Sequence, residues 1–161
     1  DTAIHLTNTT HGDHLTLSIT DAQANTLAGH DFGQFAEGDA LVDGAHSTHL
    51  STSLKDLESL NIAAVSVGAD GLTVDLGGIS SGADFENLAL NLPSFSNDGM
   101  TTLALDSAGG LAELTAIAGI DSSTLVGTLD QFADHGVDNI SIEALAASNF
   151  SSDAALAALH N

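Results

Sequence analysis

Acidic and amide side chains beside glycines are the residues of this chain best suited to bind an ion. Calcium takes roughly six to eight oxygen ligands from carboxylates, amides and carbonyls, often in loops that contain glycine. Asp70 and Asp75 flank a tight glycine turn, although no stretch has the ligand spacing of an EF-hand loop. We therefore predict a structural cation, with calcium as the first candidate. The candidate ligands are Asp70, Asp75, Asp84, Glu86, Asn97, Asp98, Asp121 and Asp138.

Two histidine pairs, each with two residues between its members, indicate an alternative chemistry. Imidazole and carboxylate together suit zinc, copper or nickel. The candidate ligands are His11, Asp13, His14, Asp43, His46 and His49. On this alternative, the chain is a transition-metal-binding protein that sequesters or senses zinc or copper. A chain with eight histidines also produces such pairs by chance, so the pattern alone does not distinguish a metal site from a coincidence.

Catalytic motifs are missing from the sequence. It contains no cysteine, no arginine, no G-x-S-x-G elbow, no P-loop and no H-E-x-x-H zinc motif. Without arginine, the usual clamp for phosphate or carboxylate substrates is absent. We therefore expect a protein that is not an enzyme.

The charge balance restricts the partners. There are 22 Asp and Glu residues against a single basic residue, Lys55, for a formal net charge of -21. Nucleic acid and anionic membranes need a basic patch, so both are unfavourable partners. Self-repulsion destabilises a compact acidic chain, and bound cations relieve it. The partners that we expect are therefore another copy of the chain or neighbouring repeats, and divalent cations. Alternatively, the acidic residues only form a coat that keeps the protein soluble.

The element that organises the chain is residues 51–67, which returns in weaker form 75 positions later as residues 126–142. Ser53 and Thr128 are predicted helix N-caps. Asn61 and Gly136 tolerate the left-handed conformation that ends a helix. The unit predicted twice is therefore a capped helix, a sharp stop and a short strand.

Other patterns predict the remaining elements. Thr20 begins a capping box, so a helix should run to about Leu27 and end at Gly29. An apolar strand at 65–68, an Asp-Gly turn and a strand at 72–76 together indicate a hairpin. Helices are also predicted at 53–60, at 111–118, from Leu129, and from Ser151 or Ser152 to Leu159. Strands are also predicted within 1–10 as an edge strand, and at 14–19, 39–42, 88–92, 102–106, 124–126 and 139–142.

These elements predict a mixed α/β fold of two related helix–strand halves. Short strands should form a central sheet, with capped Leu/Ala helices packed on it. Residues 1–161 are expected to form a single domain, with an internal repeat over 14–76 and 102–142 and a boundary near 77–83. Because the chain begins with Asp1 rather than Met, we expect a processed product or a piece of a longer protein.

The texture of residues 15–76, with SITDAQANTLAG and THLSTSLKDLESLNIAAVSV, resembles repeat modules of large acidic, cysteine-free bacterial surface or secreted proteins of the adhesin and RTX-like sort. The tandem calcium-binding nonapeptides typical of RTX proteins do not occur here. The resemblance implies export without a classical signal, calcium in the medium, and an extracellular or cell-surface role in attachment, biofilm matrix or filament building.

Overall fold

The computed structural model describes residues 5–8, 15–30, 33–35, 40–96, 98–105 and 110–141. Within these ranges the strands are β1 (His5–Asn8), β2 (Leu15–Thr20), β3 (Ala40–Gly44), β4 (Ala64–Val67), β5 (Leu72–Asp75), β6 (Ser94–Phe95), β7 (Thr101–Ala104) and β8 (Asn139–Ser141). The helices are α1 (Asp21–Gly29), α2 (Leu54–Ser59), α3 (Gly82–Leu90), α4 (Gly110–Ala118) and α5 (Ser122–Asp134). None of the helices in these ranges is long and apolar enough to cross a membrane.

The strands form two sheets, and the predicted α/β fold class is confirmed. Sheet A has the order β1-β2-β3-β4-β6, and sheet B has the order β5-β7-β8. Every strand pair is parallel except β1 with β2, which is antiparallel. The strands that we expected in one central sheet are therefore divided between two.

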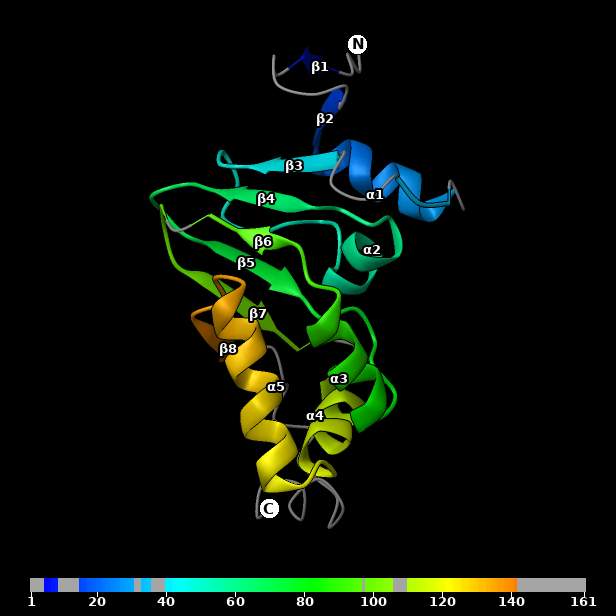
Figure 1. The fold of residues 1–161 in the computed structure, drawn as a ribbon, viewed down its shortest axis with the longest axis vertical. Coiled ribbons are helices and arrows are strands. Elements are labelled where there is room, and N and C mark those ends of the chain that lie inside the picture. Colours follow the sequence, from blue (N-terminus) through cyan, green and yellow to red (C-terminus); the bar gives the residue numbers. More distant parts are fainter. Residues whose placement is uncertain are drawn as a thin grey trace.

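The chain passes through these sheets in a repeating path. It runs along a strand of sheet A, turns a corner, runs along sheet B, and returns through a helix; we call each such pass a coil. The elements that the structure describes form three coils, within residues 40–60, 64–90 and 94–134. In the first coil, residues 48–50 serve as the sheet B strand, because Thr48 and Leu50 hydrogen-bond in parallel to Thr73 of β5. Figure 1 shows the strands stacked along the long axis of the molecule.

Ladders of apolar side chains between the sheets and the helices form the core. In sheet A, the register aligns Ile19, Val42, Val65 and Phe95, all at most 5% exposed. In sheet B, Val74 aligns with Leu103 and then Ile140. The helices close the core with Leu54, Leu57, Phe85 and Phe132, each at most 1% exposed. Each coil therefore buries its apolar face against the next coil, as in repeat proteins.

Two of the predicted helix starts are confirmed. Thr20 and Gln23 form the complete capping box of α1, in which each side chain binds the other residue's backbone N–H. Ser53 caps α2 by accepting the Asp56 N–H at 3.2 Å. The Asp56 carboxylate accepts a bond from the Ser53 hydroxyl at 2.8 Å rather than from the Ser53 backbone N–H, so the second box differs in detail.

Both predicted left-handed stops are also confirmed. Asn61 has φ 58° and Gly136 has φ 87°. At each stop the left-handed residue bonds back three positions and the next residue bonds back five, which is the Schellman arrangement. The bonds are Asn61 N to Glu58 O, Ile62 N to Leu57 O, Gly136 N to Ala133 O and Val137 N to Phe132 O. The larger internal repeat over 14–76 and 102–142 stays a prediction.

The predicted hairpin over residues 65–76 is wrong. β4 lies in sheet A and β5 in sheet B, so the two strands do not pair with each other. The turn between them is tight, since the Gly71 N–H donates to Gly68 O at 3.0 Å. The turn leads from sheet A to sheet B. Strand β4 pairs in parallel with β3 and β6, and β5 pairs in parallel with β7, so both strands bury their apolar side chains against neighbouring coils.

Two further predicted strands are wrong because they lie inside helices. Residues 88–90 belong to α3 and Asn91 is its C-cap; the buried residues Phe85, Leu88 and Ala89 follow a helical rather than an alternating period. Residues 124–126 lie in α5, which begins at its N-cap Asp121 instead of at Thr128. Thr128 is buried, and its hydroxyl donates to the Thr124 carbonyl at 2.9 Å.

The predictions near the chain ends are only partly covered. The expected edge strand is present as β1, which pairs with β2 of the same chain. The predicted helix from Ser151 or Ser152 to Leu159 and the end of the strand at 139–142 lie outside the described residues. At the predicted boundary near 77–83, Gly77 and Gly78 precede α3, which begins at Gly82.

Candidate functional site

The corners between the two sheets lie directly on one another. The first corner closes with a bond from Ser47 N to Gly44 O, and the second with one from Gly71 N to Gly68 O, both at 3.0 Å. A side chain at Gly68 would collide with the Ala45 carbonyl oxygen, and one at Gly99 with that of Gly68. Glycine therefore allows successive corners to make backbone contact.

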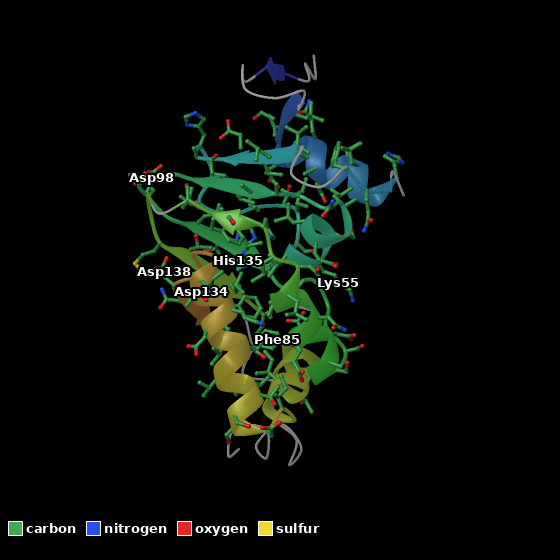
Figure 2. All side chains as sticks on the ribbon, in the orientation of Figure 1. Lys55, Phe85, Asp98, Asp134, His135 and Asp138 are labelled. Carbon is green, nitrogen blue, oxygen red and sulfur yellow. The ribbon has the colours of Figure 1, made fainter. Side chains whose placement is uncertain are left out.

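An exposed acidic residue lies in or beside each corner. Asp70 and Asp98 are exposed in the second and third corners, Asp43 is exposed on β3 just before the first corner, and Asp138 is exposed where the chain enters β8. Figure 2 shows Asp98 and Asp138 on the same side of the molecule. We call these four residues the acidic corner. It gathers three of the predicted calcium candidates along one edge, together with Asp43 from the histidine alternative.

Two of the four acidic corner residues are held by hydrogen bonds. The carboxylate of Asp43 accepts bonds from the Ala45 N–H and the Ser66 hydroxyl, both at 3.1 Å. The carboxylate of Asp138 accepts the Thr101 N–H at 2.7 Å. These two side chains are positioned by the sheets, whereas Asp70 and Asp98 lie exposed in turns.

Two other calcium candidates lie at helix N-termini: Asp121 is the N-cap of α5, and Asp84 lies in the first turn of α3, whose N-cap is Ser81. Asp121 accepts hydrogen bonds from Ser123 and Thr124, and these bonds hold its pKa well below the usual value. The Ser80 hydroxyl and backbone N–H likewise lower the pKa of Asp84, which lies in the first turn of α3. Both carboxylates therefore stabilise helix N-termini.

Of the histidine candidates, His46 and His49 lie within the described residues. His46 and His49 are exposed, and His49 Nε2 lies 3.5 Å from a carboxylate oxygen of Asp75 in the next coil. This contact joins a candidate of the alternative site to a calcium candidate. Because both side chains are about half exposed, the pair adds little stability.

No three His, Asp or Glu side chains within the described ranges gather closely enough to hold one metal ion. Glu86 lies on helix α3 and is not part of a corner between the sheets. His11, Asp13, His14 and Asn97 lie outside the described residues, so their proposed roles stay predictions.

Asp21 is a structural carboxylate that sequence reasoning did not single out. It accepts hydrogen bonds from Ser51 N, Ser51 Oγ and Thr52 N at 2.7–3.0 Å, and its own carbonyl accepts the Thr52 hydroxyl. Partial burial acts to raise the pKa of Asp21, but the bonds from Ser51 and Thr52 outweigh it and lower the pKa. Asp21 thus connects α1 to the segment that begins α2. Its place in the first turn of a helix was the only signal in the sequence.

A shallow groove of about 340 Å³ crosses the outer face of sheet A. Ser18, Leu41, Ala64 and Ser66 are among its lining residues, with Asp43 at the corner. Within the groove, the Ser66 hydroxyl donates a hydrogen bond to the Asp43 carboxylate. Several of the other lining residues have small side chains.

Comparison with known proteins gives no relative. No family model, no curated protein and no solved structure matches the chain. Function must therefore be argued from the stacked coils and their acidic surface.

Proposed function

We propose that the chain is a non-enzymatic structural or adhesive module of an extracellular bacterial surface, matrix or filament assembly. The observation that carries the proposal is the stacking of coil on coil in parallel register, with backbone contact at each corner. Such a stack grows by adding similar coils, and each coil contacts only its neighbours. That property suits a long structural protein, and the resemblance to repeat modules of bacterial surface proteins agrees with it.

Divalent cations, calcium first, are proposed to stabilise the stack at the acidic corner. One exposed acidic residue in or beside each successive corner concentrates negative charge along one edge, and the formal net charge of the chain is -21. Repulsion along this edge opposes stacking, and calcium relieves it. The carboxylates of the acidic corner supply only a few calcium ligands. Backbone carbonyls, water or a neighbouring molecule therefore complete the calcium coordination shell of about six to eight oxygens.

Melting temperature and molecular mass in solution test this proposal. The chain is measured in EDTA with sodium chloride, then in millimolar calcium at the same ionic strength. A site filled at 100 times its Kd adds about 2.7 kcal/mol. For a chain of this size that is roughly 5–10 °C in Tm. We expect calcium to raise the Tm by this amount or to drive assembly.

Zinc at micromolar concentration is the third condition. If zinc alone acts, and His46→Ala with His49→Ala abolishes the effect, the transition-metal alternative replaces the structural proposal. If sodium and calcium act equally at matched ionic strength, the acidic surface is a coat, and the proposed cation role is wrong.

A further inference from the structure

The dipeptide Asp-Gly recurs in the sequence, and each copy lies in or beside a corner between the sheets. The copies are residues 43–44, 70–71 and 98–99. In this dipeptide an aspartate side chain reacts readily with the backbone that follows it, because glycine has no Cβ to obstruct the approach. The sequence therefore offers chemically identical candidates for one modification, and the surroundings of each decide which of them reacts.

The reaction is an internal condensation followed by hydrolysis. The glycine nitrogen attacks Cγ of the preceding aspartic acid, so an N–Cγ bond forms, the Cγ–OH bond breaks, and the hydroxyl leaves as water with the amide proton. Water then opens the resulting succinimide ring. Attack at Cγ restores aspartate, whereas attack at the main-chain carbonyl carbon breaks its bond to nitrogen and leaves isoaspartate, whose backbone runs through Cγ. Water is the only co-reactant, and nothing is oxidised or reduced.

The first two pairs are held by hydrogen bonds. The glycine nitrogen must turn towards the aspartate side chain, so a bonded N–H has to open before it can react. The N–H of Gly44, which is buried, donates to Ser66 Oγ at 3.2 Å, and the same hydroxyl donates to the Asp43 carboxylate. The Gly71 N–H donates to Gly68 O at 3.0 Å. Both nitrogens are therefore restrained.

The third pair is the least restrained. Within the described part of the chain, no residue accepts a hydrogen bond from the Gly99 N–H. Asp98 is exposed in a turn, and Figure 2 shows it at the outer edge of the molecule. Water therefore reaches the Asp98 carboxyl group, and no hydrogen bond of the Gly99 nitrogen has to break before the ring closes.

A modification at Asp98 would alter a contact between corners. A side chain at Gly99 would collide with the Gly68 carbonyl oxygen, and the Leu72 N–H donates to the Met100 carbonyl at 2.8 Å. Isoaspartate lengthens the backbone by one carbon directly before these two contacts. The third corner then no longer fits against the second.

We propose that Asp98 is a site of spontaneous isoaspartate formation, and that the longer backbone loosens the third corner from the second. Asp43 and Asp70 are protected because the fold holds the nitrogen that follows each of them. The inference goes beyond the proposed function and does not depend on it, since neither cation binding nor assembly takes part in the reaction.

Peptide mapping of the full-length chain tests the proposal. One sample is aged folded in EDTA at pH 7, and another is aged in guanidinium chloride, where the hydrogen bonds of all the pairs are lost. Electron-transfer mass spectrometry then separates isoaspartate from aspartate in each peptide. In the folded chain, we expect residue 98 to react several times faster, relative to its unfolded rate, than residues 43 and 70. Equal protection of the three positions overturns the proposal, as does any order in which residue 98 is not the least protected.

Asp98→Glu is the matched control. It keeps the charge, but glutamate would have to close a larger ring, which forms far more slowly, so isoaspartate-type product should disappear from that peptide. Product that persists overturns the assignment to Asp98. The aged natural chain should also have a Tm several degrees below that of the fresh chain, while aged Asp98→Glu keeps its Tm. If the Tm is unchanged after residue 98 has reacted, the proposed loosening of the corner is wrong.

Discussion

At the scale of the residue, three carboxylates of the described residues act as acceptors for nearby backbone and hydroxyl groups. Asp21, Asp84 and Asp121 each receive several N–H or hydroxyl groups, and their pKa values are lowered. Such bonds favour the ionised form of the carboxyl group. A lowered pKa in the folded state means that the ionised carboxylate stabilises the fold.

Asp21→Asn should lower the free energy of unfolding by about 1–2 kcal/mol at pH 7, because hydrogen bonds to a charged acceptor are replaced by weaker ones. The effect depends on pH. Since the folded pKa lies below the usual 3.8, the stabilisation is complete above that value and is lost as the pH falls through the folded pKa. Denaturant unfolding of both proteins between pH 7 and pH 2 measures it.

The matched control for this prediction is Asp130→Asn, an exposed carboxylate on α5. It should change the free energy of unfolding by no more than about 0.5 kcal/mol. If Asp21→Asn and Asp130→Asn behave alike, the bonds to Ser51 and Thr52 do not stabilise the fold.

At the scale of the element, the helix stops set the path of each coil. Asn61 and Gly136 each end a helix and direct the chain towards the next strand. Two residues later, the N–H groups of Ala63 and Asp138 donate to the carbonyl oxygens of Ala40 and Thr101 in neighbouring strands. A stop that fails therefore displaces the strand after it.

Gly136→Ala should destabilise the protein by about 1–2 kcal/mol, since its φ of 87° is unfavourable for any residue with a Cβ. Gly127→Ala should stabilise it by about 0.5–1 kcal/mol, because alanine is the better residue in a helix interior and no atom obstructs the added methyl group. Equilibrium unfolding in the same buffer compares them. Equal effects from the two alanines would contradict the assigned stop.

At the scale of the whole molecule, coil stacking opposes charge repulsion. Apolar ladders join each coil to the next, while a formal net charge of -21 acts against compaction. The balance should respond to any ion that concentrates at the acidic corner.

The double variant Asp70→Asn with Asp98→Asn should reduce the rise in Tm that calcium produces, because it removes the two carboxylates exposed in corner turns. The control, Asp130→Asn with Glu58→Gln, makes the same change of charge on helices α5 and α2 and should leave the calcium effect intact. Thermal unfolding with and without calcium provides the comparison. If both double variants lose the same part of the calcium response, calcium acts on overall charge and not at the corner.

The sequence by itself determined the local features of this protein. The capping box at Thr20, the cap at Ser53 and the stops at Asn61 and Gly136 depend on contacts between residues three to five positions apart. Such contacts leave a direct signal in the order of the amino acids. The turn at Asp70 was predictable for the same reason, and so was the α/β class.

Only the tertiary structure decided how these pieces pair. The stretches 65–68 and 72–76 look like a hairpin, yet they enter different sheets, where each strand pairs in parallel with a neighbouring coil and buries its apolar side chains. Residues 88–92 alternate like a strand, but residues 88–90 belong to α3, where Leu88 and Ala89 are buried together with Phe85. The acidic corner and the role of Asp21 likewise required the fold, since they bring together residues that are far apart in the chain.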